Sequence, residues 1–331
     1  MLAELGGALA FVAIGTVVLF VGAELLVVGA ERIGRGLGLR AALVGVTLIA
    51  FVTTAPELFV AAIGALTVDP DAGLGTVLGS NIANIGLVLG VAAIIKPLEI
   101  SDRAFRRDVP VVVVAALLCY GLAAWNGQLG RFDGVVMLVV LAGFTALIYR
   151  AAAEQHRPNT GRDGDSRDRP STAGDARFPG STSSITPRDV GFVVGGLVLL
   201  VIGSRWLVAG GTDLLSAMGV SPLVIGLTVL ALGTSLPELA ASVIGAVRGQ
   251  TAFAIGNVLG SNVYNLLAVL GIVAIVVPIP VATSTLWFEF PAMVAFTVLL
   301  VGMLAHGRRL SRLDGVVLLV AYVIFVYLLF P

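Results

Sequence analysis

Residues 51–58 read FVTTAPEL and residues 232–239 read LGTSLPEL, so a proline and a glutamate recur in one register inside apolar sequence. A second pair follows at the same separation, GSNIAN at 79–84 and GSNVYN at 260–265. With a constant offset of 181 and no gap, residues 22–97 align with 203–278, and 28 of the 76 positions are identical. Apolar composition would match leucine with leucine, but it would not keep Pro, Glu, Ser and Asn in register. The chain therefore contains an internal repeat.

The composition indicates that this repeat lies in a membrane. Hydrophobic residues make up 58% of the 331 residues and charged residues only 12%, whereas soluble domains carry about 45–50% and about 25%. So few charges cannot cover a soluble fold of this size. We therefore predict an all-α integral membrane protein with the lipid bilayer around it and no nucleic-acid partner. The lone Cys119 excludes an intramolecular disulfide and a cysteine metal cage.

Long apolar runs give the expected number of transmembrane helices, since a bilayer core needs about 20 apolar residues per helix. The sequence contains ten such runs, five in a first half (1–150) and five in a second half (189–331), with the repeated motif regions at 43–95 and 224–277. The runs lie at 8–30, 42–66, 74–95, 109–126, 132–150, 190–209, 222–247, 252–277, 286–305 and 313–330.

Basic residues predict how these helices are oriented. Of the 20 Lys and Arg residues, 18 fall in the loops after runs 1, 3, 5, 7 and 9; the exceptions are Arg131 and Arg205. Because short cytoplasmic loops carry the basic excess, these five loops are predicted to be cytoplasmic and both termini extracellular. Five spans per half make the second half inverted relative to the first. Inverted repeats are typical of secondary transporters that bind their substrate near the middle of the membrane.

The segment between the halves, residues 151–188, is rich in Gly, Pro, Ser and Asp and has almost no large apolar residues. Such a segment cannot bury enough surface to offset the entropy of ordering it. We predict that it is a disordered cytoplasmic linker.

The repeated motifs place polar side chains on shared helix faces inside the apolar runs. Four pairs are spaced by four residues: Thr53 with Glu57, Thr234 with Glu238, Ser80 with Asn84, and Ser261 with Asn265. A carboxylate in the middle of a membrane costs at least about 2.5–3.5 kcal/mol, so such residues are functional candidates. Their oxygens suit Ca²⁺, which takes about 6–8 oxygen ligands, or Na⁺. The motifs contain none of the His or Cys ligands that Zn²⁺ and Cu²⁺ favour.

These motifs resemble those of a known family. GTSLPE (233–238) followed by GNVLGSNVYN (256–265) is similar to the second repeat of sodium/calcium exchangers, members of the Ca²⁺/cation antiporter superfamily. The resemblance covers the whole membrane part and implies a prokaryotic type without a regulatory domain. It implies that Glu57 and Glu238 ligate Ca²⁺ and share Na⁺, and that spans 1 and 6 slide as gates. It also implies that the ion sites are completed by Thr53, Thr54, Thr234, Ser235, Ser80 and Ser261.

The sequence departs from the family pattern in both repeats. In the first repeat Val52 stands in place of the usual Gly and Thr54 in place of Ser; in the second, Asn265 stands where many exchangers carry Asp, with Asn84 opposite it. The site then holds two carboxylates instead of three, which balance one Ca²⁺ or two Na⁺. These departures therefore affect the expected ion selectivity and stoichiometry more than they affect the expectation of antiport.

The function expected from these features is Na⁺/Ca²⁺ antiport across the cell membrane by alternating access, with extrusion of Ca²⁺. We expect a monomer that is not an enzyme and needs no cofactor beyond the transported ions. A Ca²⁺/H⁺ or other cation/H⁺ antiporter on the same scaffold is the alternative, and a cation channel is more remote. Glu24 and Arg205 occupy equivalent positions in the two repeats, which we call positional mates, and they carry opposite charges. One expectation is that they pair across the repeats.

Overall fold

The computed structural model describes residues 2–37, 39, 41–67, 70–155, 185–217, 233 and 235–329. Most of the predicted linker, 156–184, therefore lies outside the described residues, and so does Thr234. Helix α7 extends to Gln155 and α8 begins at Pro187. The ends of the segment predicted as linker are thus helical.

Nearly all of the described residues are helical, and π-helical segments, labelled η, interrupt several helices. The first half contains α1 (Leu2–Gly36), α2 (Ala41–Val44), η1 (Gly45–Ile49), α3 (Ala50–Thr67), α4 (Pro70–Ala83), η2 (Asn84–Leu89), α5 (Gly90–Ile95), β1 (Leu98–Glu99), α6 (Asp102–Asn126), β2 (Gln128–Leu129) and α7 (Arg131–Gln155). The second half contains α8 (Pro187–Ala217), α11 (Leu236–Val247), α12 (Thr251–Val263), η5 (Tyr264–Val269), α13 (Leu270–Val276), β3 (Ile279–Pro280), α14 (Thr283–Trp287), α15 (Glu289–Ala305), β4 (Arg309–Leu310) and α16 (Arg312–Leu328).

The prediction of an all-α, multi-pass membrane protein is confirmed. Among the described residues, seven helical stretches are long and apolar enough to cross a bilayer, and two shorter apolar helices cover Gly45–Thr54 and Leu236–Val247. Each of the seven overlaps one of the ten predicted runs. The other three runs overlap the two shorter helices and α16, which has 17 residues.

The repeat extends beyond the motifs into the short strands. Strand β1 pairs antiparallel with β4, and β2 pairs antiparallel with β3. At the offset of 181, Leu98 of β1 corresponds to Ile279 of β3, and Gln128 of β2 corresponds to Arg309 of β4. Each ladder therefore joins a strand of the first half to a strand of the second half.

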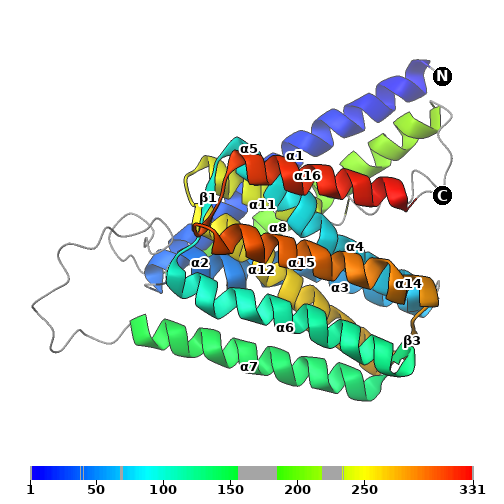
Figure 1. The fold of residues 1–331 in the computed structure, drawn as a ribbon. Helices are drawn as coiled ribbons and strands as arrows, with labels where there is room; N and C mark the ends of the chain where they lie inside the picture. The colour runs from blue at the N-terminus through cyan, green and yellow to red at the C-terminus, as the bar shows by residue number, and fades with distance from the viewer. Residues whose placement is uncertain are drawn as a thin grey trace, which may run out of the picture.

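The ladders lie at opposite ends of the helix bundle. Figure 1 shows β1 at the end of the bundle where α7 ends, and β3 at the opposite end, where α16 ends. We call these the linker end and the termini end. The loops after α1, α5, α7, α11 and α15, which hold most of the basic residues, belong to the linker end because the chain returns there after each pair of crossings.

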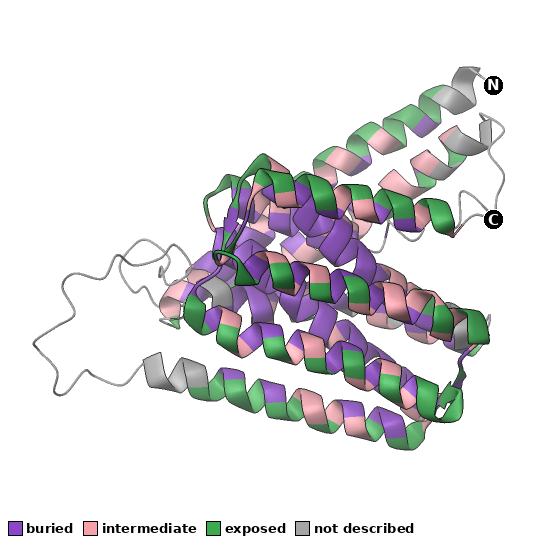
Figure 2. Ribbon diagram, in the orientation of Figure 1, coloured by how far each residue is buried: buried purple, intermediate pink, exposed green. Residues whose placement is uncertain are grey.

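The bundle is built around α12, in which all thirteen residues are buried. Figure 2 shows the buried residues in the middle of the bundle, with exposed outer faces on α6, α7, α15 and α16. These outer faces carry large apolar side chains, such as Val139 and Val323, that are more than half exposed. An apolar outer surface is expected of helices that face lipid.

Helices α1 and α8 pack on each other in an antiparallel arrangement and project beyond the bundle at the termini end (Figure 1). Glycines make their contact close. A Cβ on Gly22 would lie 2.7 Å from the Leu200 backbone N, and one on Gly203 would lie 2.5 Å from the Leu19 backbone N. Only residues without a side chain allow two helices to approach so closely along their backbones. The two helices therefore form a tightly packed unit.

Candidate ion-binding site

The two motif glutamates occupy different helical contexts in the two halves. Glu57 lies inside α3, which continues through Pro56, whereas Glu238 lies in the first turn of α11. Ser235 is the N-cap residue of α11, and Pro237 sits in its first turn, where a missing N–H is tolerated. The free N–H groups at a helix N-terminus favour negative charge, so α11 supports a carboxylate at Glu238. Both carboxyl groups are fully buried.

The second motif lies where an α-helix changes to a π-helix in both halves. Ser80 lies in the last turn of α4, one turn before Asn84 opens η2, and Ser261 lies in α12 one turn before Asn265 in η5. All four side chains are buried. A π-helical turn holds an extra residue and often marks a functional site, because it changes which side chains share a face. The sequence analysis did not predict these π-helical segments.

Close backbone contact brings the first motif of one half to the second motif of the other. A Cβ on Gly45 would lie 2.4 Å from the Phe253 carbonyl oxygen, and one on Gly260 would lie 2.6 Å from the Val46 carbonyl oxygen. Helix α12 can therefore lie against η1 and α3. As a result, Thr53 Oγ1 lies 3.5 Å from Ser261 Oγ. The repeats thus meet at a shared site, as the inverted arrangement predicts.

Oxygen atoms without hydrogen-bond donors gather at this meeting point. The carboxyl groups of Glu57 and Glu238 face each other, and the hydroxyls of Thr53 and Ser261 lie beside Glu238. Among the described residues, several buried motif atoms have no hydrogen-bond partner: both carboxylate oxygens of Glu57 and of Glu238, the hydroxyls of Thr54 and Ser235, the amide oxygens of Asn81 and Asn84, and both amide atoms of Asn265. Buried polar atoms are normally partnered, so these atoms form a coordination set suited to a hard cation.

Asparagines of both halves form a short chain of hydrogen bonds beside the carboxylates. Asn84 Nδ2 donates to Asn262 Oδ1 at 3.1 Å, and Asn262 Nδ2 donates to the Asn81 carbonyl oxygen at 3.4 Å. Asn81 Nδ2 donates to the Val77 carbonyl oxygen at 2.8 Å. These donors hold the side-chain amide groups in place. The amide oxygens of Asn81 and Asn84 are left free.

Asn257 is a site residue that the sequence analysis missed. Its Nδ2 donates to Ser242 Oγ at 3.0 Å, and its Oδ1 lies 3.4 Å from Thr53 Oγ1. All three side chains are buried. The repeat gave no signal for this residue, because its positional mate is Thr76 and the mate of Ser242 is Ala61. Its position one turn before Ser261 on α12 is the feature that could have identified it.

Of the predicted site residues, the structure brings Thr53, Glu57, Glu238 and Ser261 together. Nine of the ten, all except Thr234, are at most 4% exposed. They come from α3, from α4 with η2, from the start of α11, and from α12 with η5.

One expectation outside the site is wrong. Glu24 does not pair with Arg205 but with Arg248, which follows α11. In the antiparallel contact of α1 and α8, Gly22 meets Gly196 and Gly15 meets Gly203. Glu24 therefore lies near the level of Gly196, whereas Arg205 lies near the level of Gly15. That separation is nine residues along a helix, or about 14 Å.

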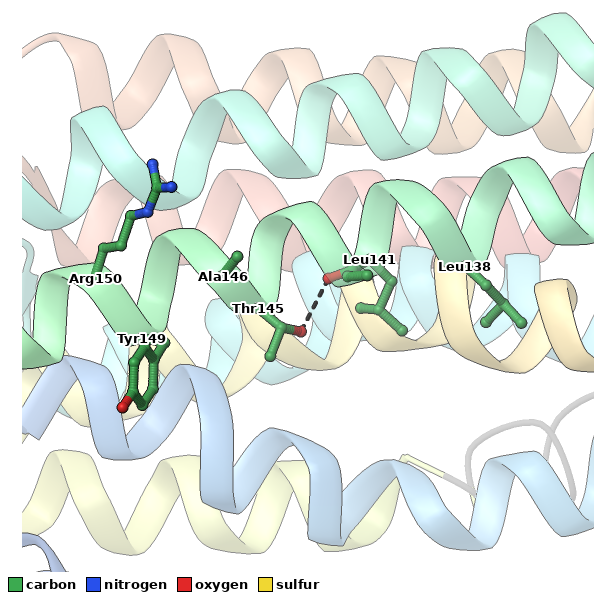
Figure 3. Close-up of a pocket in the computed structure, with 7 residues that line it drawn as sticks. Leu138, Leu141, Thr145, Ala146, Tyr149 and Arg150 are labelled. Atoms are coloured by element: carbon green, nitrogen blue, oxygen red, sulfur yellow. Dashed lines mark hydrogen bonds between the residues drawn. The ribbon is translucent and has the colours of Figure 1, made fainter.

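A surface hollow on α7 differs in character from the carboxylate site. It has a volume of about 550 Å³, and Figure 3 shows its lining residues, with Arg150 and Tyr149 at one end and Leu138 at the other. Its one hydrogen bond among the residues drawn runs from Thr145 Oγ1 to the Leu141 carbonyl oxygen. Its lining contains no carboxylate and none of the repeated motifs.

Comparisons with known proteins agree with this arrangement. The family model described as "Sodium/calcium exchanger protein" matches residues 7–150 and 189–330. The chain is 37% identical over 324 residues to the "Putative antiporter CaxA" of Alkalimonas amylolytica, covering 97% of this chain and 98% of that protein. It is 29% identical over 343 residues to the sodium/calcium exchanger MaX1 of Methanosarcina acetivorans, covering 96% and 97%.

Solved structures of the sodium-calcium exchanger NCX_Mj share the fold. In crystals soaked with 10 mM Na⁺ and 10 mM Sr²⁺, that protein superimposes with a TM-score of 0.78 and 25% sequence identity, over 97% of this chain and 98% of that chain. The form soaked with 10 mM Na⁺ and no Ca²⁺ gives the same TM-score.

Proposed function

The chain belongs to the sodium/calcium exchanger family, and we propose that it is a secondary active antiporter that exchanges Na⁺ for Ca²⁺ across the cell membrane and extrudes Ca²⁺. The carrying observation is the pair of buried carboxylates, Glu57 and Glu238, whose oxygens lack donors among the described residues. An unpaired buried carboxylate is strongly disfavoured. A bound cation is the compensation that such a pair of acids calls for.

The ligand set of this proposal consists of hard oxygens from both repeats. Glu57 and Glu238 supply the charge, and neutral oxygens complete the coordination of Ca²⁺ or Na⁺. The neutral ligands are Thr53, Thr54, Thr234, Ser235, Ser80, Ser261, Asn84 and Asn265. Support comes from the buried, unpartnered oxygens and from the structures of NCX_Mj soaked with Na⁺ and Sr²⁺.

The proposed architecture has ten transmembrane helices in two inverted five-helix repeats, 1–150 and 189–331, with both termini extracellular and the 151–188 linker cytoplasmic. Two observations support this topology. Both termini lie at one end of the bundle (Figure 1), as an even number of crossings requires. The loops at the other end hold 18 of the 20 Lys and Arg residues, which favours the cytoplasm for that end. We further propose that the antiporter works as a monomer.

In this proposal, access to the site alternates as α1 and α8 slide together across the remaining helices. The glycine contacts of α1 with α8 favour movement of the two helices as one body. The surface they slide on is apolar and includes small side chains, Ala23 and Ala30 of α1 and Ala240 and Ala241 of α11, among larger ones. Small side chains interlock little, so the contact resists sliding less than a contact of large side chains would.

Exchange of Ca²⁺ for H⁺ is the second candidate, and one observation favours it. The Glu57 and Glu238 carboxyl groups face each other, and two neighbouring acids can share a proton in place of a cation. The two mechanisms share the ligand set and differ only in the ion that returns.

Uptake of ⁴⁵Ca²⁺ into proteoliposomes separates these candidates. We expect an outward Na⁺ gradient at equal pH to drive Ca²⁺ inward above its equilibrium level, and a pH gradient without Na⁺ to drive none. Uptake driven only by the pH gradient would establish the H⁺ mechanism instead. Uptake that never exceeds the electrochemical equilibrium of Ca²⁺ under either gradient would show a channel. Proteoliposomes with Glu238→Gln serve as the matched control.

A further inference from the structure

A cluster of charged groups fastens α1 to the turn between α11 and α12. Arg248 donates to both carboxylate oxygens of Glu24, and its Nη1 lies 3.5 Å from Glu31 Oε2. Gln250 Nε2 donates to the same Glu31 oxygen at 3.0 Å, and Arg35 Nη2 donates to Glu31 Oε1 at 2.8 Å. Charge-assisted and bidentate contacts of this kind are directional and stronger than neutral hydrogen bonds.

The turn that holds Arg248 is short and joins the two helices that carry site residues of the second half. Arg248 caps the C-terminus of α11, Gly249 has a positive φ of 80°, and Gln250 precedes α12. Helix α11 carries Glu238 in its first turn, and α12 carries Ser261. A force on Arg248 therefore acts on the hairpin that holds the ligands of the second repeat.

The apolar contact between α1 and this hairpin does not by itself select one position along the helix axis. Hydrophobic burial is non-directional and depends on area, and this contact consists of apolar residues, among them Ala23, Leu26 and Ala241. A shift of α1 along its axis exchanges one apolar residue for another. The ion pairs, in contrast, exist only where α1 places an acid beside Arg248.

Helix α1 offers Arg248 two acids on one face. Glu24 and Glu31 are seven residues apart, which is two helical turns or about 10 Å. Two turns before Glu24, toward the termini end, the residue on this face is Val17, which cannot form an ion pair with Arg248. Moving α1 toward the termini end brings Glu31 to Arg248 and releases Glu24. Moving it further toward the linker end leaves Arg248 beside apolar residues.

We propose that Arg248 is a positioning residue for transport, which sets the register of α1 against the α11–α12 hairpin by contacting Glu24 and Glu31 together. The two acids lie about 10 Å apart along α1, so a shift of α1 toward the termini end retains only Glu31, and a shift toward the linker end retains only Glu24 until both contacts are lost. The device is specific to one side. The mates of Arg248 and Glu24 are Thr67 and Arg205, so the repeat does not place the same pair of charges at the other end.

The register can be measured directly by the distance between two spin labels. Val17 on α1 and Leu313 at the start of α16 are exposed, and both can be labelled as cysteines in a Cys119→Ala background. Because Val17 lies on the termini-end side of Glu24 and Leu313 lies at the linker end, a shift of α1 toward the termini end lengthens this distance.

Two variants should move the distance in opposite directions. Glu24→Gln leaves Glu31 as the only charged partner, so we expect a longer Val17–Leu313 distance. Glu31→Gln leaves Glu24, so we expect a shorter one. Arg248→Gln should broaden the distribution of this distance. Arg205→Gln is the control, because Arg205 is exposed and has no ion pair among the described residues.

The transport consequence rests on the proposed function, whereas the register is measured without transport. A changed conformational balance alters the apparent affinity in proportion to the competent fraction. The apparent KM for Ca²⁺ should therefore change in opposite directions at the two membrane faces in Glu24→Gln, and a merely destabilised protein would not behave in this way. Unchanged distances in all three single variants, or equal shifts in Arg205→Gln, would overturn the role of Arg248 even if exchange is normal. Opposite shifts of the Val17–Leu313 distance in a protein that exchanges no Na⁺ would support the role of Arg248 and reject the proposed function.

Discussion

The number of carboxylates at the site predicts that exchange is insensitive to membrane voltage. Glu57 and Glu238 provide two negative charges, and the fully buried Asn265 provides none. One Ca²⁺ or two Na⁺ neutralise this site completely. Each cycle then moves no net charge. The variant Asn265→Asp adds a third negative charge, which a third Na⁺ balances and a single Ca²⁺ does not.

The size of the expected effect follows from this count of charges. Moving one elementary charge through 100 mV is worth about 2.3 kcal/mol, and about 1.4 kcal/mol is a factor of ten in an equilibrium. A potential of 100 mV should therefore change the steady-state Ca²⁺ ratio of the Asn265→Asp variant about 50-fold. The same potential should leave the ratio of the parent protein unchanged.

The assay is ⁴⁵Ca²⁺ accumulation in proteoliposomes at a fixed Na⁺ gradient, with the potential set by K⁺ and valinomycin. The amide of Asn265 has no partner among the described residues, so the added charge should not break an existing hydrogen bond. Asn84→Asp is the matched comparison from the first repeat. A parent protein whose Ca²⁺ ratio follows the potential would refute the charge count and the stoichiometry drawn from it.

The other predictions concern single contacts. Glu57→Gln and Glu238→Gln should each abolish Ca²⁺ exchange while the protein stays monodisperse in size-exclusion chromatography, because one charge cannot balance a divalent ion; near-parent uptake by either would reject the site. Asn257→Ala should weaken the apparent Ca²⁺ affinity about tenfold, because it leaves buried polar groups without partners, at a cost of about 1–3 kcal/mol. Ser242→Ala keeps the contact between Asn257 and Thr53, so it should weaken the affinity less. The reverse order would argue against a positioning role for Asn257. Gly22→Leu should lower the melting temperature because its Cβ would lie 2.7 Å from the Leu200 backbone N, whereas Gly6→Leu, with open space around it, should not; equal melting temperatures would show that the glycine contact is dispensable.

Much of the site could be predicted from the sequence because the chain contains it twice. Proline, glutamate, serine and asparagine in register at two places identify Glu57 with Glu238 and Ser80 with Ser261. An inverted repeat then requires the two copies to meet. The structure brings Thr53 beside Ser261, across the boundary between the halves, as this reasoning expects.

The features that the sequence did not predict are those that break the repeat or lie in the backbone. Asn257 has Thr76 as its mate, so a search for repeated residues passes over it. The π-helical segments that begin near Asn84 and Asn265 depend on which backbone carbonyl accepts the hydrogen bond of each N–H group, and residue type does not determine that pattern. The partner of Glu24 depends on the level at which antiparallel helices cross. Position in the repeat gives the mate Arg205, but packing places Arg248 beside it.

The two strand ladders have a consequence for how such a protein can assemble. Each half contributes one strand to the ladder at either end, and neither half can complete a ladder by itself. Two identical copies of one half, inserted into the membrane in opposite orientations, would hold the same four strands and could close both ladders between them. In the proposed inverted architecture the chain is therefore arranged like an antiparallel homodimer fused into one polypeptide. Gene duplication followed by fusion is the simplest route to such a chain, and the ladders belong, with the α1–α8 contact, to the interface between its halves.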